Sequence, residues 1–314
     1  MKGEDGEMKQ RIFLNNQSAV AGVIEALLLV ALVAIILSFI QLYYVPEIMK
    51  DREADHMDQV SNQFSYLKSV IEIQSTMGII NEESANPKYT AYTSSSSPVT
   101  MGSRELPYFI SQRSAGQISV IDKDSSGPYK INIQPAPADF PSGIPLTSIK
   151  YEAFNYYYLD GGKIIYTLEG GGIILKQTDG EVMRVFPAMN VVNYTNEIEI
   201  NWDIPLFKGV PGKNITGGYK EIYIRTNYTT YYEHQGTANF IQIYTDYPDA
   251  WNHSLINTTR GLLWEYYDNG YINVQVDKSS IPNRVIITPA TKNIYITLTI
   301  VEIGTQVGAG AVIS

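Results

Sequence analysis

The side chains that most often carry chemistry are few in this sequence, and they are not spaced for it. The only histidines are His56, His234 and His253, and none has a second histidine or an acid at metal-ligand spacing. Cysteine is absent, which excludes disulfides, thiolate catalysis and cysteine zinc sites. We therefore expect each histidine to be a surface residue, and we predict no metal site, no cofactor and no catalytic residue.

Three weaker patterns leave a binding or enzymatic role open. Residues 122–127 (DKDSSG) resemble the opening of a calcium loop, but Ile133 stands where the bidentate acid belongs, which favours a polar hairpin turn. Glu197 and Glu199 share a strand face, although glycosidase carboxylates are recognised only by their separation in space. Tyrosine clusters could stack sugars, but exposed tyrosines more often serve packing and interfaces. A carbohydrate-binding protein and, less favoured, an ectoglycosidase remain alternatives.

Several Asn-x-Ser/Thr sequons fall in the region that we predict to be rich in strands. Such a sequon marks an acceptor for N-linked glycan in an exterior protein. A further match at Asn16 lies on the presumed inner side of a membrane, where we expect no modification. The predicted glycosylation sites are Asn193, Asn214, Asn227, Asn252 and Asn257.

Residues 26–45 form an apolar run without a charged residue. At 1.5 Å per residue the run spans about 30 Å, the thickness of a bilayer core. Tyr43 and Tyr44 stand at its far end, where aromatic rings favour the interface. We predict a transmembrane or filament-core helix over residues 19–45. Its one acid, Glu25, either reaches the headgroups or pairs with a charge on a neighbouring subunit.

Residues 46–80 follow with apolar side chains at steps of three and four, as in an amphipathic helix. Pro46 should kink or interrupt the helix where it leaves the bilayer. Polar residues such as Glu53 and Lys68 are expected to face water. The expected buried stripe consists of Val60, Phe64, Leu67, Ile71 and Gln74.

The remainder divides into a loop and a β-rich domain. Residues 81–115 include the run SSSSP at 94–98 and many turn formers, and we predict a linker or long loop. Residues 116–314 alternate apolar and polar side chains, which predicts strands with one buried face. The predicted class is α+β, a long N-terminal helix followed by an antiparallel β-sandwich-like domain. A net charge of −9 without a basic stripe argues against a nucleic-acid binder.

The N-terminal residues resemble the start of archaeal type IV pilin-like proteins. Basic residues and a short polar stretch precede Gln17-Ser18-Ala19-Val20, which leads directly into the apolar helix. Segments 166–187 and 244–251 also resemble uncharacterised archaeal surface proteins with pilin-like N-termini. The resemblance implies a class III signal peptide over residues 1–18, cut by a prepilin peptidase between Asn16 and Gln17. By this resemblance, Glu25 is similar to the acid near the start of mature pilins.

These observations favour a structural protein rather than an enzyme. We expect a pilin-like subunit of an archaeal cell-surface filament, with the apolar helix in the core and a glycosylated β domain outside, serving adhesion or surface contact. Its expected partners are copies of itself, the prepilin peptidase, the pilus assembly machinery and membrane lipid before assembly. The precursor would lie in the cell membrane and the mature protein at the cell surface. The alternative is a monomeric, membrane-anchored envelope protein that binds cell-wall or surface-layer carbohydrate.

Overall fold

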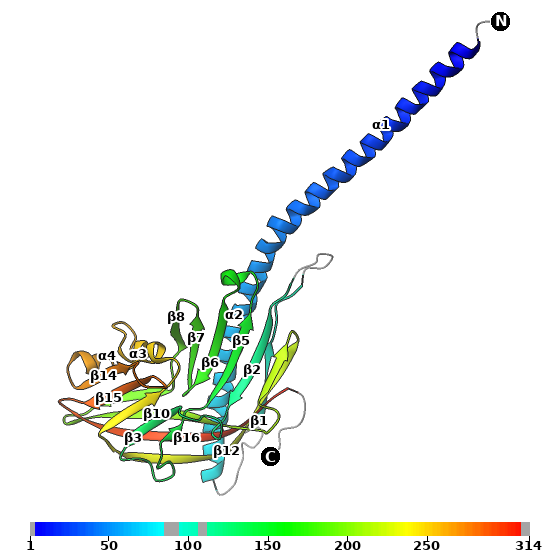
Figure 1. Cartoon of the computed structure of the whole chain (residues 1–314). Coiled ribbons are helices and arrows are strands. Elements are labelled where there is room, and N and C mark those ends of the chain that lie inside the picture. The colour runs from blue at the N-terminus through cyan, green and yellow to red at the C-terminus, as the bar shows by residue number, and fades with distance from the viewer. Residues whose placement is uncertain (1–3, 85–93, 106–111, 309–314) are drawn as a thin grey trace.

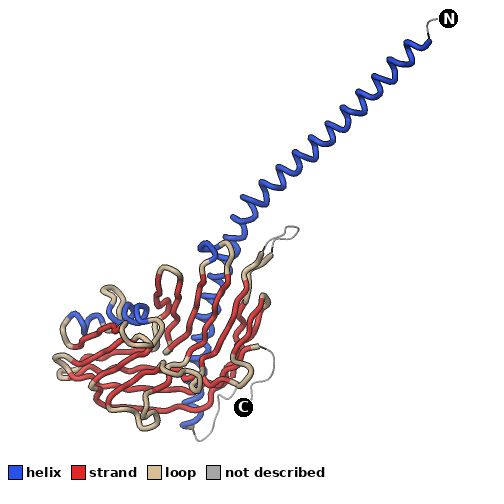
Figure 2. The backbone as a smooth tube through the Cα atoms, in the orientation of Figure 1, coloured by secondary structure: helices blue, strands red, loops and turns tan. Residues whose placement is uncertain are grey.

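A computed structural model describes residues 4–84, 94–105 and 112–308, with side chains from Val20 onward except at residues 160–161. A long N-terminal helix projects from a mostly β domain (Figure 1). The far end of the same helix runs through that domain beside the strands (Figure 2). This arrangement confirms the α+β class.

The helix continues through Pro46, so the interruption offered as one expectation does not occur, but a π-helical turn precedes the proline and the helix changes direction between α1 and α2 (Figure 1). It comprises α1 (Glu4–Phe39), a π-helical turn η1 (Ile40–Tyr44) and α2 (Val45–Glu83). Proline lacks an N–H and its ring clashes with the carbonyl one turn earlier. In η1 the Val45 N–H bonds to the Ile40 carbonyl, five residues back, and such a widened turn gives the ring space.

The strands form three sheets within the described residues. The first sheet has the order β1 (Ser94–Thr100), β12 (Glu221–Ala238), β16 (Asn293–Val307), β10 (Glu197–Gly209) and β9 (Met189–Asn193). The second has the order β11 (Ile215–Gly218), β2 (Ala115–Ile121), β5 (Ser148–Phe154), β6 (Lys163–Glu169), β7 (Gly172–Gln177) and β8 (Gly180–Val185). The third has the order β14 (Ile272–Asp277), β15 (Arg284–Pro289), β13 (Phe240–Tyr244), β3 (Lys130–Gln134) and β4 (Ile144–Pro145). Short helices complete the domain: η3 (Tyr158–Gly161), α3 (Pro248–Ile256) and α4 (Trp264–Asp268).

Two expectations about these strands need correction. The loop predicted over 81–115 contains β1, an edge strand that pairs with β12. In this pairing Val99 is fully buried. Strand β10 pairs in parallel with β16, so the domain is not wholly antiparallel. A parallel pair needs a long crossover, and residues 210–292 supply it. The two-sheet sandwich stays a prediction.

The first sheet serves two hydrophobic cores because its long strands change their buried face. In β16, Ile294, Ile296 and Leu298 face the core shared with the third sheet. Further along the same strand, Val301 and Ile303 face the core shared with α2 and the second sheet. The period-two pattern therefore shifts by one residue midway, and the residues near the shift are buried on both sides.

Helix α2 is fixed to the domain by a continuous buried stripe. Phe64, Leu67 and Ile71 are buried in the second core, as the periodicity predicts. The expectation that Glu53 and Lys68 face water is wrong, because their side chains are 0% and 8% exposed. Glu53 continues the stripe toward the N-terminus, and Lys68 pairs with Glu72 beside it.

Helix α2 packs tightly against β12 at Gly78, and this contact leads to a stability prediction. A Cβ added to Gly78 would lie 2.1 Å from Cδ2 of Tyr228 in β12. We expect Gly78→Ala to lower the free energy of unfolding by about 2 kcal/mol through overpacking. The measurement is denaturant unfolding of the full chain in detergent. Gly236→Ala, in the same strand but with nothing within 4 Å of the added Cβ, is the matched control; equal effects would contradict close packing at Gly78.

Candidate functional site

The most exposed apolar surface of the molecule surrounds the helix between Val20 and Tyr44, and we call it the apolar helix surface. Apart from the half-buried Ile40, its large apolar side chains are each between 46% and 70% exposed. They are Val20, Val23, Ile24, Leu27, Leu28, Leu29, Val30, Leu32, Val33, Ile35, Ile36, Leu37, Phe39, Leu42, Tyr43 and Tyr44. Among the described residues, this helix is the one long and apolar enough to cross a membrane. Apolar area on this scale implies contact with lipid or with another protein.

The predicted cleavage site and the acid lie on this same helix. Helix α1 is continuous across Asn16 and Gln17, whose side chains lie outside the described part of the chain. Glu25 is exposed on the apolar helix surface, in the second turn after Val20. Its carboxylate is therefore available to a headgroup or to a neighbouring helix.

The first two sequons differ in accessibility. Asn193, at the end of β9, is exposed, and its Oδ1 accepts a hydrogen bond from Lys292 Nζ at 2.5 Å. Asn214 is half-buried, and its Nδ2 donates to Asp122 Oδ2 at 3.0 Å. An N-linked glycan replaces one of the two hydrogens of this amide nitrogen, so Asp122 competes with modification of Asn214.

The other three sequons lie within regular structure. Asn227 is a half-buried residue of β12, paired with β1 on one side and β16 on the other. Asn252 lies in α3, and Asn257 follows its last residue. Asn257 Nδ2 lies 3.0 Å from His253 Nε2, and its Oδ1 accepts two backbone N–H groups of the following turn. Asn193 is thus the most open of the five positions.

The expectation that every histidine lies at the surface is wrong for His56. This residue of α2 is 4% exposed, and its Nε2 lies 2.9 Å from the Thr100 carbonyl oxygen. Burial lowers the pKa of His56, which favours the neutral ring. His253 is exposed and His234 is half-buried. No cluster of three histidine or acidic residues suited to a metal occurs in the part of the chain that the structure describes.

A buried carboxylate joins α2 to the loop between β5 and β6. The side chain of Glu53 accepts backbone N–H groups from Tyr156 at 3.0 Å, Tyr157 at 2.8 Å and Tyr158 at 2.7 Å. Several N–H donors directed at one carboxylate stabilise its charge and satisfy the loop backbone together. The contact fixes this loop beside the first turns of α2.

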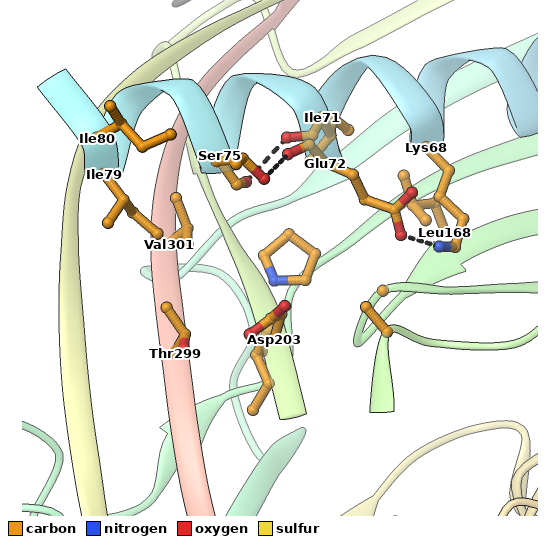
Figure 3. A pocket seen from close by; sticks show the side chains of 15 residues that line it. Lys68, Ile71, Glu72, Ser75, Ile79, Ile80, Leu168, Asp203, Thr299 and Val301 are labelled. Carbon is orange, nitrogen blue, oxygen red and sulfur yellow. Dashed lines mark hydrogen bonds and ion pairs between the residues drawn. The ribbon is translucent and has the colours of Figure 1, made fainter. Parts of the chain in front are cut away.

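A groove of about 320 Å³ lies between the second half of α2 and strands β10 and β16. Figure 3 shows Asp203 directed from β10 toward the helix, with Lys68 and Glu72 at one end and Ile79 and Ile80 at the other. Desolvation raises the pKa of Asp203, and the Glu72 carboxylate raises it further, although a hydrogen bond from Thr299 opposes them. The fifteen lining residues include no aromatic side chain, so the groove lacks a platform for stacking a sugar ring.

A second buried acid, Glu169, lies at the end of β6. Its Oε1 accepts hydrogen bonds from Thr245 Oγ1 at 2.7 Å and from Trp251 Nε1 at 2.9 Å. Burial raises its pKa to about 7, although both hydrogen bonds oppose the shift. The neighbouring pocket, which Tyr129 and Asp246 also line, measures about 20 Å³ and has no room for a sugar. We interpret Glu169 as a structural acid.

The tyrosine clusters do not form one platform. Tyr156 belongs to the loop that Glu53 holds. Tyr231 Oη donates to Glu83 at the end of α2 at 2.8 Å, and Tyr266 Oη donates to the Val191 carbonyl at 3.2 Å. These tyrosines therefore serve separate packing contacts.

Two of these sites were missed by the sequence reasoning for different reasons. Glu53 precedes Met57 by four residues and so continues the apolar stripe, and a charge at a stripe position is a signal for a buried, paired carboxylate. Glu169 carries no such signal, because Thr245 and Trp251 are distant in sequence.

The Glu53 contact leads to a prediction about the domain's attachment to the helix. We expect Glu53→Gln to lower the free energy of unfolding by about 2 kcal/mol, because an amide nitrogen replaces one acceptor oxygen and the charge is lost. Denaturant unfolding measures the loss, and hydrogen exchange at residues 156–158 should become faster. Glu47→Gln, an exposed acid on the same helix, is the control; exchange as slow as in the parent chain would contradict the assignment.

The raised pKa of Glu169 predicts a pH dependence with a defined sign. Between pH 4.5, the ordinary pKa of a glutamate, and about 7 the folded state binds more protons than the unfolded state, so stability falls as pH rises. The loss is about 3 kcal/mol at most. Thermal unfolding across this range should show a slope that Glu169→Gln removes, because the amide does not titrate. The difference between the two proteins cancels the contributions of other acids, and an unchanged slope would contradict the shift.

Comparisons with known proteins return no relative. No family model, no curated protein and no solved structure matches the chain. The likeness to archaeal pilin-like proteins stays a prediction from the residues quoted above.

Proposed function

We propose that the protein is a pilin-like structural subunit of an archaeal cell-surface filament, held in the membrane before assembly by its N-terminal helix. The apolar helix surface supports this proposal most directly. About 37 Å of helix exposes apolar side chains, which is enough to span a bilayer core of about 30 Å with some tilt. In a filament, identical helices packed side by side would bury this apolar surface against one another instead of in lipid.

The connection between helix and domain also supports a structural role. The helix does not end at the edge of the domain but continues as α2 into the second core (Figure 1). Glu53 and the buried stripe fix the domain to this continuation. A force on the helix is thus carried into the domain through a packed core, as a filament subunit requires.

We infer that the β domain forms the exterior of the filament. A sandwich-like exterior carrying glycans at the predicted asparagines would cover the filament and mediate adhesion or surface contact. The open position of Asn193 supports glycan attachment. Prepilin peptidase and assembly machinery are the partners that this route requires, and the cell surface is the destination.

A second candidate is a permanent membrane anchor carrying an envelope-binding domain. The continuous α1 across Asn16 and Gln17 favours it, because proteases cut extended, exposed segments more readily than helices. The bound material would be cell-wall or surface-layer carbohydrate. An ectoglycosidase has less support, since the buried Glu169 has no space for substrate beside it.

The main test uses filament assembly. Replacement of Leu32 by arginine, near the middle of the apolar helix surface, costs about 3 kcal/mol in lipid and should weaken insertion and prevent the close helix packing that filaments require. Deletion of residues 17–44 should abolish both insertion and filaments and release a soluble domain. Tyr66→Arg, at an exposed position of α2, is the matched control and should assemble normally. Filaments containing the deleted chain, seen by electron microscopy, would overturn the proposal.

Mass spectrometry of the native protein separates the two candidates. A mature N-terminus at Gln17 supports processing and assembly. Intact residues 1–16 on a protein that forms no filaments favour the permanent anchor, and glycan-array binding of the full chain in detergent then tests for carbohydrate.

A further inference from the structure

The β5–β6 loop, residues 155–162, lies where the helix enters the domain. Figure 1 shows η3, which is part of this loop, beside the helix at the end of the domain from which α1 emerges. Val45 and Met49, in the first turns of α2, are 2% and 0% exposed, and η3 packs against α2. The Glu53 contact fixes the loop at this position. It is therefore among the first parts of the domain beyond the apolar helix surface.

The loop and Phe154, the last residue of β5, expose apolar side chains at this position. Phe154, Tyr156 and Leu159 are 43%, 52% and 44% exposed. Lys163 follows with its Nζ 5.8 Å from the centre of the Phe154 ring. Aromatic rings beside a lysine are typical of the zone between lipid tails and headgroups.

Leu159 has an unusual backbone conformation for an exposed leucine. Its φ of 51° lies in the left-handed region, and it is the one non-glycine residue with positive φ among the described residues. Glycine and asparagine adopt this conformation more easily than leucine does. An apolar residue that is both strained and exposed makes a functional contact a reasonable hypothesis.

We propose that the β5–β6 loop rests on the membrane surface, with Phe154, Tyr156 and Leu159 among the lipid headgroups. This inference depends on the proposed membrane insertion of the helix and adds a second contact to it. The helix alone would leave the domain free to tilt and rotate. The loop contact would hold the domain at one orientation over the bilayer, because Glu53 ties the loop to the helix.

Single cysteines test this contact, since the chain has none of its own. Spin labels at Leu159→Cys, Leu28→Cys and Ile281→Cys are compared in full-length protein in phosphatidylcholine vesicles, by their collision rates with oxygen and with a water-soluble nickel complex. Leu28 is on the apolar helix surface, and Ile281 is 100% exposed between β14 and β15. We expect the oxygen-to-nickel ratio at position 159 to exceed that at 281 several-fold and to lie below that at 28.

Each outcome has a distinct meaning. A ratio at 159 equal to that at 281, with a high ratio at 28, overturns the loop contact but leaves the membrane helix intact. A low ratio at 28 overturns the membrane insertion on which both proposals rest. Shielding of 159 from both reagents, with dipolar broadening between labels, identifies a second copy as the occupant and also overturns the lipid contact.

A matched substitution separates lipid contact from folding. Leu159→Asn suits the left-handed backbone while removing the apolar group. In a Tyr156→Cys background it should lower the oxygen-to-nickel ratio of the label at 156 several-fold, with no loss of thermal stability in detergent. An unchanged ratio would overturn the role of Leu159.

Discussion

Burial of one stripe of α2 between two sheets is the constraint on which the rest of the domain depends. The stripe from Met57 to Ile71 supplies apolar side chains to a core that β2, β5, β6 and β16 complete. Without this helix, the second sheet would expose one face to water. The apolar segment before it contributes nothing to this core, so a single helix serves two environments.

Buried charges in the domain are compensated locally. Glu53 has three backbone donors, and Glu302 is 3% exposed but lies between Lys123 and Lys208. Such pairs contribute to specificity of the fold more clearly than to its stability, because desolvation offsets much of the attraction. At Glu53 the specificity has a geometric result, since the carboxylate determines which loop lies beside the helix where it leaves the domain.

The sequence predicted best what depends on local periodicity. The apolar run, the stripe of α2 and the alternation in β10 and β16 follow from spacing alone. Strand β1 was missed because four serines and Pro98 suggest a loop, while pairing with β12 is a long-range effect. The parallel β10–β16 pair and the partners of Glu169 were likewise beyond local pattern, since each joins segments far apart in sequence.

The π turn at Ile40–Tyr44 determines how far the domain is rotated about the axis of the N-terminal helix. One residue of an α-helix corresponds to a rotation of about 100° about the axis, and a π turn accommodates one extra residue. The turn therefore determines which side of the apolar rod the bulky domain occupies. In a helical array of such rods, a one-residue deletion there would rotate each domain by about 100° and direct it toward a different neighbour.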